Sequence, residues 1–339
     1  MVKTPGKGQW IASTAKTIAR TYFKDLKRAM EQHELGNATL ATMLFVILLV
    51  VSCGALDNST GGSTSPPPTN SGTDFTGQHV HVVGSSALQP LAAKAADLFR
   101  QHHPEVKIDV QAGGSIIGLN AVTNHQSDIG DSDIYADPTV YPDPNLTDHI
   151  VCVTAMTLIV NPEVNITSLN TQQVINIYTG VTTNWKDVGG PNLAVVPLVK
   201  PTTSGTRALF DKYLMGGEQE MGQSVADAST VVIDTVAHTP GAIGYVTTAL
   251  VNSTVKAIDL DGVSATAQNV QAGKYRFWGF EHMYTLQNGI NATTAYLDFM
   301  QTPQIQQLAL TLGYISASSV SSSAPQAQQA RVVSTSGSL

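Results

Sequence analysis

Apolar residues between about residues 78 and 315 follow two periods, and these predict a series of strands and helices. A strand-like run over 80–83 is followed by residues 88–99, where apolar side chains recur at helical spacing until a proline stops the pattern. The order then repeats along the chain. Strands are predicted over 106–110, 151–160 and 195–199, and helices over 119–125 and 171–179. This βαβα order predicts an α/β fold in two lobes, with parallel sheets covered by helices.

The N-terminal segment has a different pattern. An apolar run over 41–51 follows a basic head and precedes Cys53. This run is too short for a comfortable transmembrane helix and is typical of the apolar part of a signal peptide, here expected over 1–52. The residues Val50, Val51 and Ser52 before the cysteine resemble a bacterial lipobox, in which the cysteine is acylated and becomes the mature N-terminus. An uncleaved signal anchor is the alternative, and either reading puts the body outside the cytoplasm.

Two further segments have almost no apolar periodicity. Residues 53–77 are rich in Ser, Thr, Gly, Pro and Asn, and residues 316–339 are similar in composition. The first is predicted to be a flexible tether and the second a disordered tail.

Composition and charge narrow the function classes. A chain of 339 residues with 42% hydrophobic and 13% charged residues is globular and long enough for two domains. Of its 18 Lys/Arg and 25 Asp/Glu, residues 1–52 hold seven and three, so residues 53–339 carry a net charge of −11. This body has no basic footprint for nucleic acid. The only other cysteine, Cys152, lies in an apolar strand-like run, which predicts a buried thiol and no disulfide framework.

Four short loops rich in Gly, Ser and Thr follow predicted strands. They are Gly84–Ala87, Gly113–Ser115, Gly130–Asp133 and Thr202–Arg207. The first, second and fourth lead into predicted helices, whose N-termini present unpaired N–H groups and a partial positive charge. With a hydroxyl from Ser86, Ser115 or Ser204, each loop could bind an anion. The same residues could simply cap the helices, but their shared position at strand ends favours a common oxyanion site. No P-loop or Rossmann glycine pattern indicates a nucleotide.

Several motifs in a fixed order carry a resemblance to a known family. They are Val83–Leu91, Asp128–Asp133, Ile177–Gly180, Thr183–Trp185, Ser204–Arg207, Pro240–Tyr245 and Phe277–Thr285. Together they resemble the phosphate-binding proteins of bacterial phosphate-specific ABC importers, in the periplasmic-binding-protein superfamily. The resemblance implies a two-lobed, type II fold with mixed, mostly parallel sheets, helices on both faces and a ligand cleft between the lobes. Lobe 1 is expected over 78–156 and 280–315, and lobe 2 over 157–279.

The resemblance also implies a set of phosphate-binding residues. These would be Ser86 with the N–H of Ala87 or Leu88, then Ser115, Asp133, Ser204, Gly205 and Thr206. Lys200 stands where the family usually has Arg, so the point charge of an ammonium group replaces a planar guanidinium group that could donate two hydrogen bonds. Arg207 could compensate for this, or it could be a structural residue of its helix.

The expected role of Asp133 is to distinguish phosphate from sulfate. A carboxylate only accepts hydrogen bonds, so it can pair with the proton of hydrogen phosphate and repels the unprotonated sulfate. The neighbouring Asp131 would oppose a dianion if it faced the site, and it is expected to face solvent or a cation. Ile116 and Ile117 replace a Gly/Thr pair common in the family, which could restrict the approach of the backbone to the ligand.

Other functions find less support in the sequence. His79 and His81 alternate on a strand and His102 and His103 end a helix, but neither pair shows a convergent spacing with Asp, Glu or Cys, so no metal site is expected. His282 is expected to be a packing residue. No nucleophile elbow or Ser-His-Asp order is present, so we expect neither an enzyme nor a cofactor.

The expected partners follow from the resemblance. They are inorganic phosphate, an ABC permease with its ATPase subunits, and the membrane through a lipid on Cys53, with the protein itself a monomer. Two alternatives stay open: a binder of another oxyanion (sulfate, molybdate or a phosphonate), or a phosphate-sensing lobe without a transport role.

Overall fold

The computed structural model describes residues 75–286 and 289–320, which form a mixed α/β fold. The helices are α3 (Gln89–His102), α4 (Ser115–Thr123), α5 (Thr171–Tyr178), α6 (Gly205–Phe210), α7 (Ser229–His238), α8 (Ala267–Gln271), α9 (Asn291–Met300) and α10 (Pro303–Thr311). The strands are β1 (His79–Gly84), β2 (Lys107–Ala112), β3 (Ile129–Ser132), β4 (Leu146–Val160), β5 (Ser168–Leu169), β6 (Val196–Val199), β7 (Gln223–Ser224), β8 (Ala242–Thr247), β9 (Lys256–Leu260) and β10 (Trp278–Leu286). Within the described ranges, no helix is long and apolar enough to span a bilayer.

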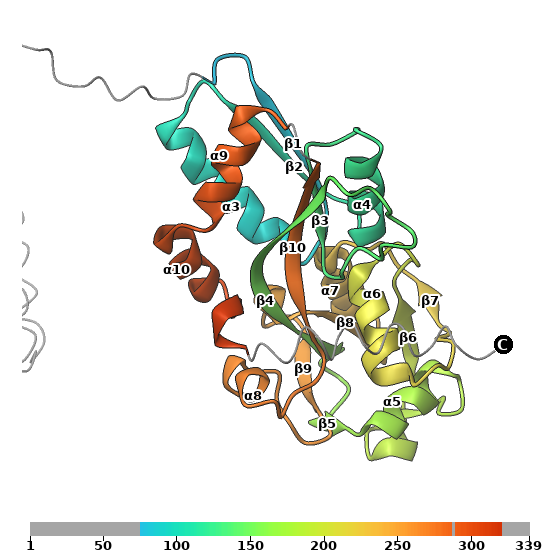
Figure 1. Ribbon diagram of the computed structural model, residues 1–339. Helices are drawn as coiled ribbons and strands as arrows, with labels where there is room; N and C mark the ends of the chain where they lie inside the picture. Colours follow the sequence, from blue (N-terminus) through green and yellow to red (C-terminus); the bar gives the residue numbers. More distant parts are fainter. Residues whose placement is uncertain (1–74, 287–288, 321–339) are drawn as a thin grey trace, which may run out of the picture. The chain divides into compact units, whose positions relative to one another are not determined.

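The strands form a mixed sheet in the order β2-β1-β3-β10-β4-β8-β6-β7, with β9 on β4 and β5 on β9. Pairing is parallel towards both ends, where β1 joins β2 and β3, and β6 joins β7 and β8. In the centre, β10 is antiparallel to both β3 and β4, and β4 is antiparallel to β8. The long strands β4 and β10 lie side by side along the middle of the molecule (Figure 1). They therefore connect two lobes.

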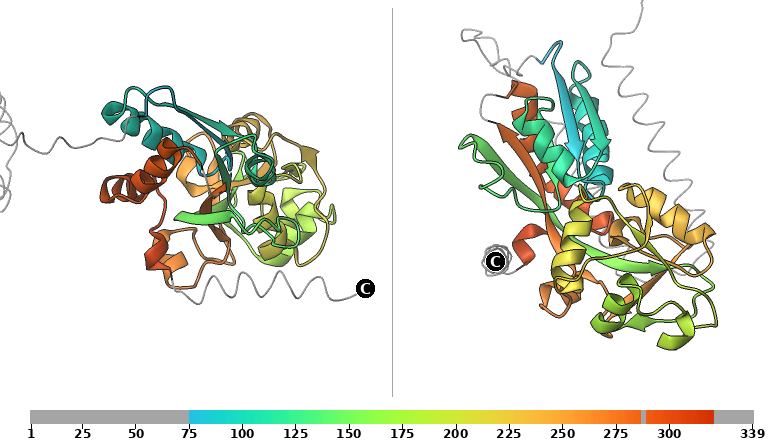
Figure 2. Two further views of the ribbon diagram at one scale, coloured as in Figure 1. Left: turned by 45° about the horizontal axis from the view of Figure 1, so that its top comes forward. Right: turned by 90° about the vertical axis from the view of Figure 1, so that its right-hand side faces the viewer.

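One hydrophobic core lies where α3, α9 and α10 cover a face of β1, β2 and β3 (Figures 1 and 2). The alternate strand residues Val80, Val82 and Ile108 are buried in it, as the period of two predicts. Phe99 and Tyr296 pack edge to face at 5.8 Å, and the Tyr296 hydroxyl donates to a carbonyl of α3 at 2.7 Å. Cys152 is free and buried in the same core, as predicted.

A second core fills the lobe that contains β8 and β9, and it combines aliphatic residues with a group of buried aromatic side chains. The rings of Phe210 and Tyr245 stack at 4.2 Å. The Trp185 indole is fully buried and donates to the Gly241 carbonyl at 2.9 Å. Gly241 has φ 76°, and a Cβ there would lie 2.0 Å from the Ala194 carbonyl oxygen, so only glycine fits. These residues of the sequence motifs thus stabilise the lobe.

Local sequence signals, such as capping residues and glycines, predict most of the ends of the helices and strands. Helix α5 has a capping box between Asn170 and Gln173, and Gly180 follows it in the left-handed region at φ 77°. Two elements begin earlier than predicted: β4 starts at residue 146, and α4 starts at residue 115. The polar start of β4 is a strand because it pairs with β10, which the sequence pattern did not reveal.

The predicted end segments reach partly into the described residues. Phe75, assigned to the tether, is buried, and it packs at 6.3 Å from Phe99. Val320, assigned to the tail, is also buried and follows a short turn at Ala317–Ser319. The predicted signal peptide, Cys53 and most of both segments lie outside the described residues. The lobe boundaries given above stay a prediction.

Candidate oxyanion-binding site

Three of the predicted loops meet where the two lobes face each other. The Asp133 amide, directly after β3, donates to the Ser115 hydroxyl at the start of α4 at 2.9 Å. Across the gap, the Ile116 amide donates to the Thr203 carbonyl at 3.1 Å. At the start of α6, a Cβ built on Gly205 would lie 2.0 Å from the Ser115 hydroxyl oxygen. The helix starts of the two lobes are therefore in direct contact.

Asp133 is buried at the centre of this contact, with 3% of its surface exposed. One carboxylate oxygen accepts a hydrogen bond from the Thr206 hydroxyl at 2.8 Å. The other, Oδ1, is buried and has no hydrogen-bond partner among the described residues. Burial raises the pKa of Asp133 and the Asp227 carboxylate adds to this, whereas the hydroxyls of Ser85 and Thr206 and the charge of Lys200 act to lower it. A buried acceptor oxygen without a partner is costly, so this atom can gain a proton donor from a ligand.

Lys200 supplies a buried cation beside Asp133 and follows strand β6. Its ammonium group donates to the Asp227 carbonyl at 2.7 Å and lies 3.6 Å from the Asp227 carboxylate. The Ser86 hydroxyl donates to the same carbonyl at 3.1 Å. Burial lowers the pKa of Lys200, whereas Asp227 and Asp133 oppose this shift. Asp227 therefore joins the first loop of lobe 1 to the lysine of lobe 2.

Arg207 lies behind the loop. Its guanidinium donates to the Lys200 carbonyl at 2.7 Å and pairs with Glu220 at 2.5 Å. The Tyr245 hydroxyl donates to Glu220 at 3.0 Å and accepts from the Lys200 amide at 3.3 Å. These contacts favour the structural role for Arg207, because its charge is matched by Glu220 and its donors hold the backbone of Lys200. Ser204 caps α6 through the Arg207 amide at 3.2 Å.

The loop before α3 is organised by Ser85. Its hydroxyl oxygen accepts hydrogen bonds from the Ala87 and Leu88 amides at 3.0 and 2.9 Å, so both predicted phosphate donors already have an internal partner. The same hydroxyl donates to Glu281 of β10 at 3.2 Å. Glu281 is fully buried, and burial raises its pKa well above the ordinary value, with Asp133 adding to the shift.

The expectation that Asp131 faces solvent is wrong. The residue is 1% exposed on β3, between β1 and β10. Burial raises its pKa well above the ordinary value, and Asp133 adds to this. Asp131 therefore points into the protein, where a raised pKa favours the neutral form and reduces its repulsion of an anion.

Comparison with known proteins identifies the family of this chain. A family model described as a PBP superfamily domain matches residues 63–304. The curated phosphate-binding protein PstS of Bacillus subtilis (strain 168) is 34% identical over 279 residues, which cover 81% of this chain and 93% of that protein. The chain belongs to the PBP superfamily, in the family of the PstS proteins.

Solved structures show the same fold at lower identity. A phosphate ABC transporter substrate-binding protein with bound phosphate from Clostridium perfringens has a TM-score of 0.67 and 24% identity, and covers 70% of this chain and 99% of its own. An ABC-type phosphate transport receptor from Vibrio cholerae has a TM-score of 0.57 and 24% identity, with the same coverage. The two-lobed α/β fold of this PBP-superfamily protein is thereby confirmed.

Sequence reasoning missed three residues that organise the site: Ser85, Asp227 and Glu281. Ser85 lies inside a predicted loop, and its neighbour Ser86 was preferred because of the family pattern. Asp227 contacts Ser86 and Lys200 largely through its backbone carbonyl, which leaves no sequence signal. Glu281 lies in the motif Phe277–Thr285, where a carboxylate within an apolar strand is an available signal.

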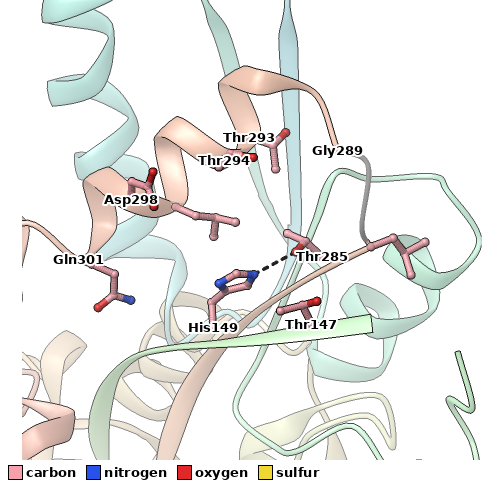
Figure 3. Close-up of a pocket in the computed structure, with 10 residues that line it drawn as sticks. Thr147, His149, Thr285, Gly289, Thr293, Thr294, Asp298 and Gln301 are labelled. Atoms are coloured by element: carbon pink, nitrogen blue, oxygen red, sulfur yellow. Dashed lines mark hydrogen bonds between the residues drawn. The ribbon is translucent and has the colours of Figure 1, made fainter. Parts of the chain in front are cut away.

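A pocket of about 250 Å³ lies elsewhere, between β4, β10 and α9 (Figure 3). His149 and Thr285 form a hydrogen bond at its base at 3.0 Å. None of the predicted oxyanion-binding residues lines it. This pocket is therefore not the candidate oxyanion-binding site, which remains at Asp133.

Proposed function

We propose that this protein captures inorganic phosphate as HPO4²⁻ between its two lobes and delivers it to an ABC permease for import. The observation that carries the proposal is the buried, unpartnered carboxylate oxygen of Asp133, set among the hydroxyls of Ser115 and Thr206 and the cation of Lys200. The phosphate-binding names of its PstS relatives support the same ligand.

The proposed ligand set has two halves. Ser86, Ala87, Leu88 and Ser115 would serve from lobe 1, and Lys200, Ser204, Gly205 and Thr206 from lobe 2. Neutral N–H and O–H donors would surround the anion, and Lys200 would supply the positive charge. Since Ala87 and Leu88 donate to Ser85 in the structure, an anion there would compete with or share the Ser85 hydroxyl.

Asp133 would set the selectivity. Hydrogen phosphate has one proton to donate, and Asp133 Oδ1 would accept it. Sulfate has none, so its oxygen would face a carboxylate oxygen with no hydrogen between them. A repulsive contact of this kind discriminates more strongly than a weakened attraction.

The geometry favours binding over catalysis. The hydroxyls of Ser86, Ser115 and Thr206 contact a carbonyl, an amide and a carboxylate respectively. None of these three is paired with a histidine base that could activate it as a nucleophile. We therefore propose a transport role without enzymatic activity.

Replacement of Asp133 by Asn tests the proposal. Asparagine keeps the size but presents an amide that can donate to sulfate. We expect the phosphate affinity of the Asp133→Asn variant to fall by about tenfold or more and its preference over sulfate to shrink or reverse. Calorimetric titration of the full-length protein in detergent with each anion measures both.

The exposed Asp187 provides a matched control, because Asp187→Asn makes the same chemical change far from any predicted ligand. Its two titration curves should equal those of the wild type. If Asp133→Asn leaves both titration curves unchanged, Asp133 does not accept a hydrogen bond from the phosphate proton. If the wild type ignores phosphate at millimolar levels, the proposed function itself is wrong.

We also propose an extracytoplasmic location with a lipid anchor on Cys53. The apolar run over 41–51 and the lipobox-like residues before the cysteine support it. Cys53→Ala should then release the protein into the soluble fraction of cells. Retention of this variant in the membrane would favour an uncleaved anchor.

A further inference from the structure

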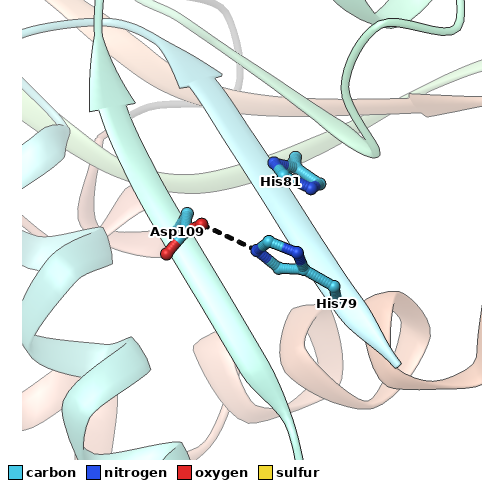
Figure 4. Close-up of side chains that lie close together, drawn as sticks. All are labelled: His79, His81 and Asp109. Carbon is cyan, nitrogen blue, oxygen red and sulfur yellow. Dashed lines mark hydrogen bonds and ion pairs between the residues drawn. The ribbon is translucent and has the colours of Figure 1, made fainter. Parts of the chain in front are cut away.

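Two histidines and an aspartate converge on the sheet of lobe 1. His79 and His81 lie on β1 and Asp109 lies on the neighbouring β2, and one potential metal-ligand atom from each lies within 4.8 Å of the others (Figure 4). His79 Nε2 is 2.7 Å from Asp109 Oδ2. The two imidazole rings lie 3.8 Å apart, measured between their centroids.

Strand geometry brings these side chains together. Residues two apart on a strand point to the same face. In the parallel register, His81 pairs with Asp109 and His79 with Lys107, so all four side chains lie on one face of the sheet. The intervening Val80 and Ile108 are buried in the core on the other face. The cluster therefore occupies the side of β1 and β2 opposite that core.

The sequence expectation of no convergent carboxylate is wrong for this histidine pair. Asp109 is far along the chain from both histidines, and only the β1–β2 pairing places it beside them. His102 and His103 differ, because they end α3 and neither belongs to such a cluster among the described residues.

We infer that His79, His81 and Asp109 form a binding site for a divalent transition-metal ion of the zinc class. Two imidazole nitrogens and one carboxylate oxygen are the ligands that zinc accepts in three-ligand protein sites, with water in the remaining position. Mixed nitrogen and oxygen ligands favour zinc, copper or nickel over magnesium and calcium, which prefer oxygen alone. On binding, the metal would take the place of a proton shared between His79 Nε2 and Asp109 Oδ2, and this proton would be released to solvent.

The charges around the cluster are compatible with a cation. Lys107 Nζ lies 3.6 Å from Asp109 Oδ2, but its side chain is 66% exposed and can turn into solvent. The Asp128 carboxylate accepts from the His81 amide at 2.8 Å and adds negative charge nearby.

The site is separate from the proposed phosphate site. His79 and His81 are in the first half of β1, whereas the loop around Ser86 follows the other end of the strand, at Gly84. The two sites thus share one strand, and the metal site does not depend on the proposed phosphate function.

Zinc titration of the full-length protein in phosphate-free buffer with detergent tests this inference. We expect one site that is lost or weakened by about tenfold or more in each of His79→Ala, His81→Ala and Asp109→Asn. A double variant, His102→Ala with His103→Ala, removes the same number of imidazoles elsewhere and should keep the site. Electron paramagnetic resonance with Cu²⁺ should show two nitrogen ligands in the wild type and one in each single histidine variant.

Circular dichroism of each variant checks that it is folded, independently of the proposed phosphate binding. Unchanged zinc affinity in all three variants, no saturable zinc binding in the wild type, or an equal loss in the control variant would each overturn the inference. Loss in Asp109→Asn alone would also overturn it, because the ion would then be held without the histidines.

Discussion

At the scale of single residues, the candidate site depends on close approach as much as on charge. Gly205 has an ordinary helical backbone, so no special φ angle requires glycine there. Glycine is required there for lack of space, because a Cβ would lie 2.0 Å from Ser115 Oγ and 2.9 Å from Asp133 Cβ. One added methyl group would therefore separate the two helix starts that face each other across the site.

This leads to a prediction for Gly205→Ala. The overpacking cost of about 1–3 kcal/mol should appear as a loss of phosphate affinity of about fivefold to 150-fold, because it opposes the contact between the lobes. Gly113→Ala is the matched control, since its methyl group would meet only the Ile117 side chain at 3.3 Å, which can move. Calorimetric phosphate titration compares them. Equal affinities in the two variants would show that the close contact at Gly205 is not needed for binding.

The residues that sequence reasoning found and missed differ in how they act. Ser115, Asp133 and Thr206 act through side chains placed at strand ends or helix starts, and loop composition reveals such positions. Asp227 acts largely through a backbone carbonyl, and the burial of Asp131 depends on the strands beside it. Neither the carbonyl contacts of Asp227 nor the burial of Asp131 can be predicted from the local sequence, because both depend on the tertiary structure.

At the scale of elements, β3 and β10 bury acids behind the oxyanion loops. Asp131 lies on β3 opposite Met283 of β10, and Glu281 lies two residues before Met283 on the same strand. Burial raises the pKa of both carboxyls well above their ordinary values. The loop Gly130–Asp133 after β3 was predictable from its turn residues, but the antiparallel pairing of β3 with β10 was not, because a strand pattern does not identify the partner strand.

The raised pKa of Glu281 predicts a pH dependence of stability. Its folded pKa lies above its unfolded value of 4.5, so the folded protein holds a proton that the unfolded chain releases. The free energy of unfolding should therefore fall as pH rises from 4.5 to the folded pKa, by up to about 1.4 kcal/mol for each unit of the pKa shift. Glutamine at this position stays neutral and can still accept from Ser85.

Denaturant unfolding at several pH values tests this with Glu281→Gln. The variant should gain stability relative to the wild type as pH rises. The exposed Glu163→Gln is the matched control, with a difference from the wild type that stays constant across the series. A constant difference for Glu281→Gln as well would mean that Glu281 is ionised in the folded protein throughout.

At the scale of the whole molecule, the charge of the body opposes the charge of its proposed ligand. Residues 53–339 carry 11 Lys/Arg against 22 Asp/Glu, a net charge of −11. The buried Lys200 is already paired with Asp227 and offers little attraction at a distance. We therefore expect a dianion to be repelled as it approaches. It should be bound only when it reaches the hydroxyl and amide groups of the proposed phosphate-binding loops.

Ionic strength separates these two stages. At 0.1 M, added salt largely screens repulsion between charges more than about 10 Å apart, and it affects buried contacts much less. Stopped-flow measurement should thus show phosphate association becoming faster as sodium chloride is raised, with dissociation nearly unchanged. Replacing three exposed acids (Glu163→Gln, Asp187→Asn and Glu218→Gln) should speed association at low salt and flatten its salt dependence. Association that slows with salt would instead require a local positive field at the cleft strong enough to outweigh the acidic body.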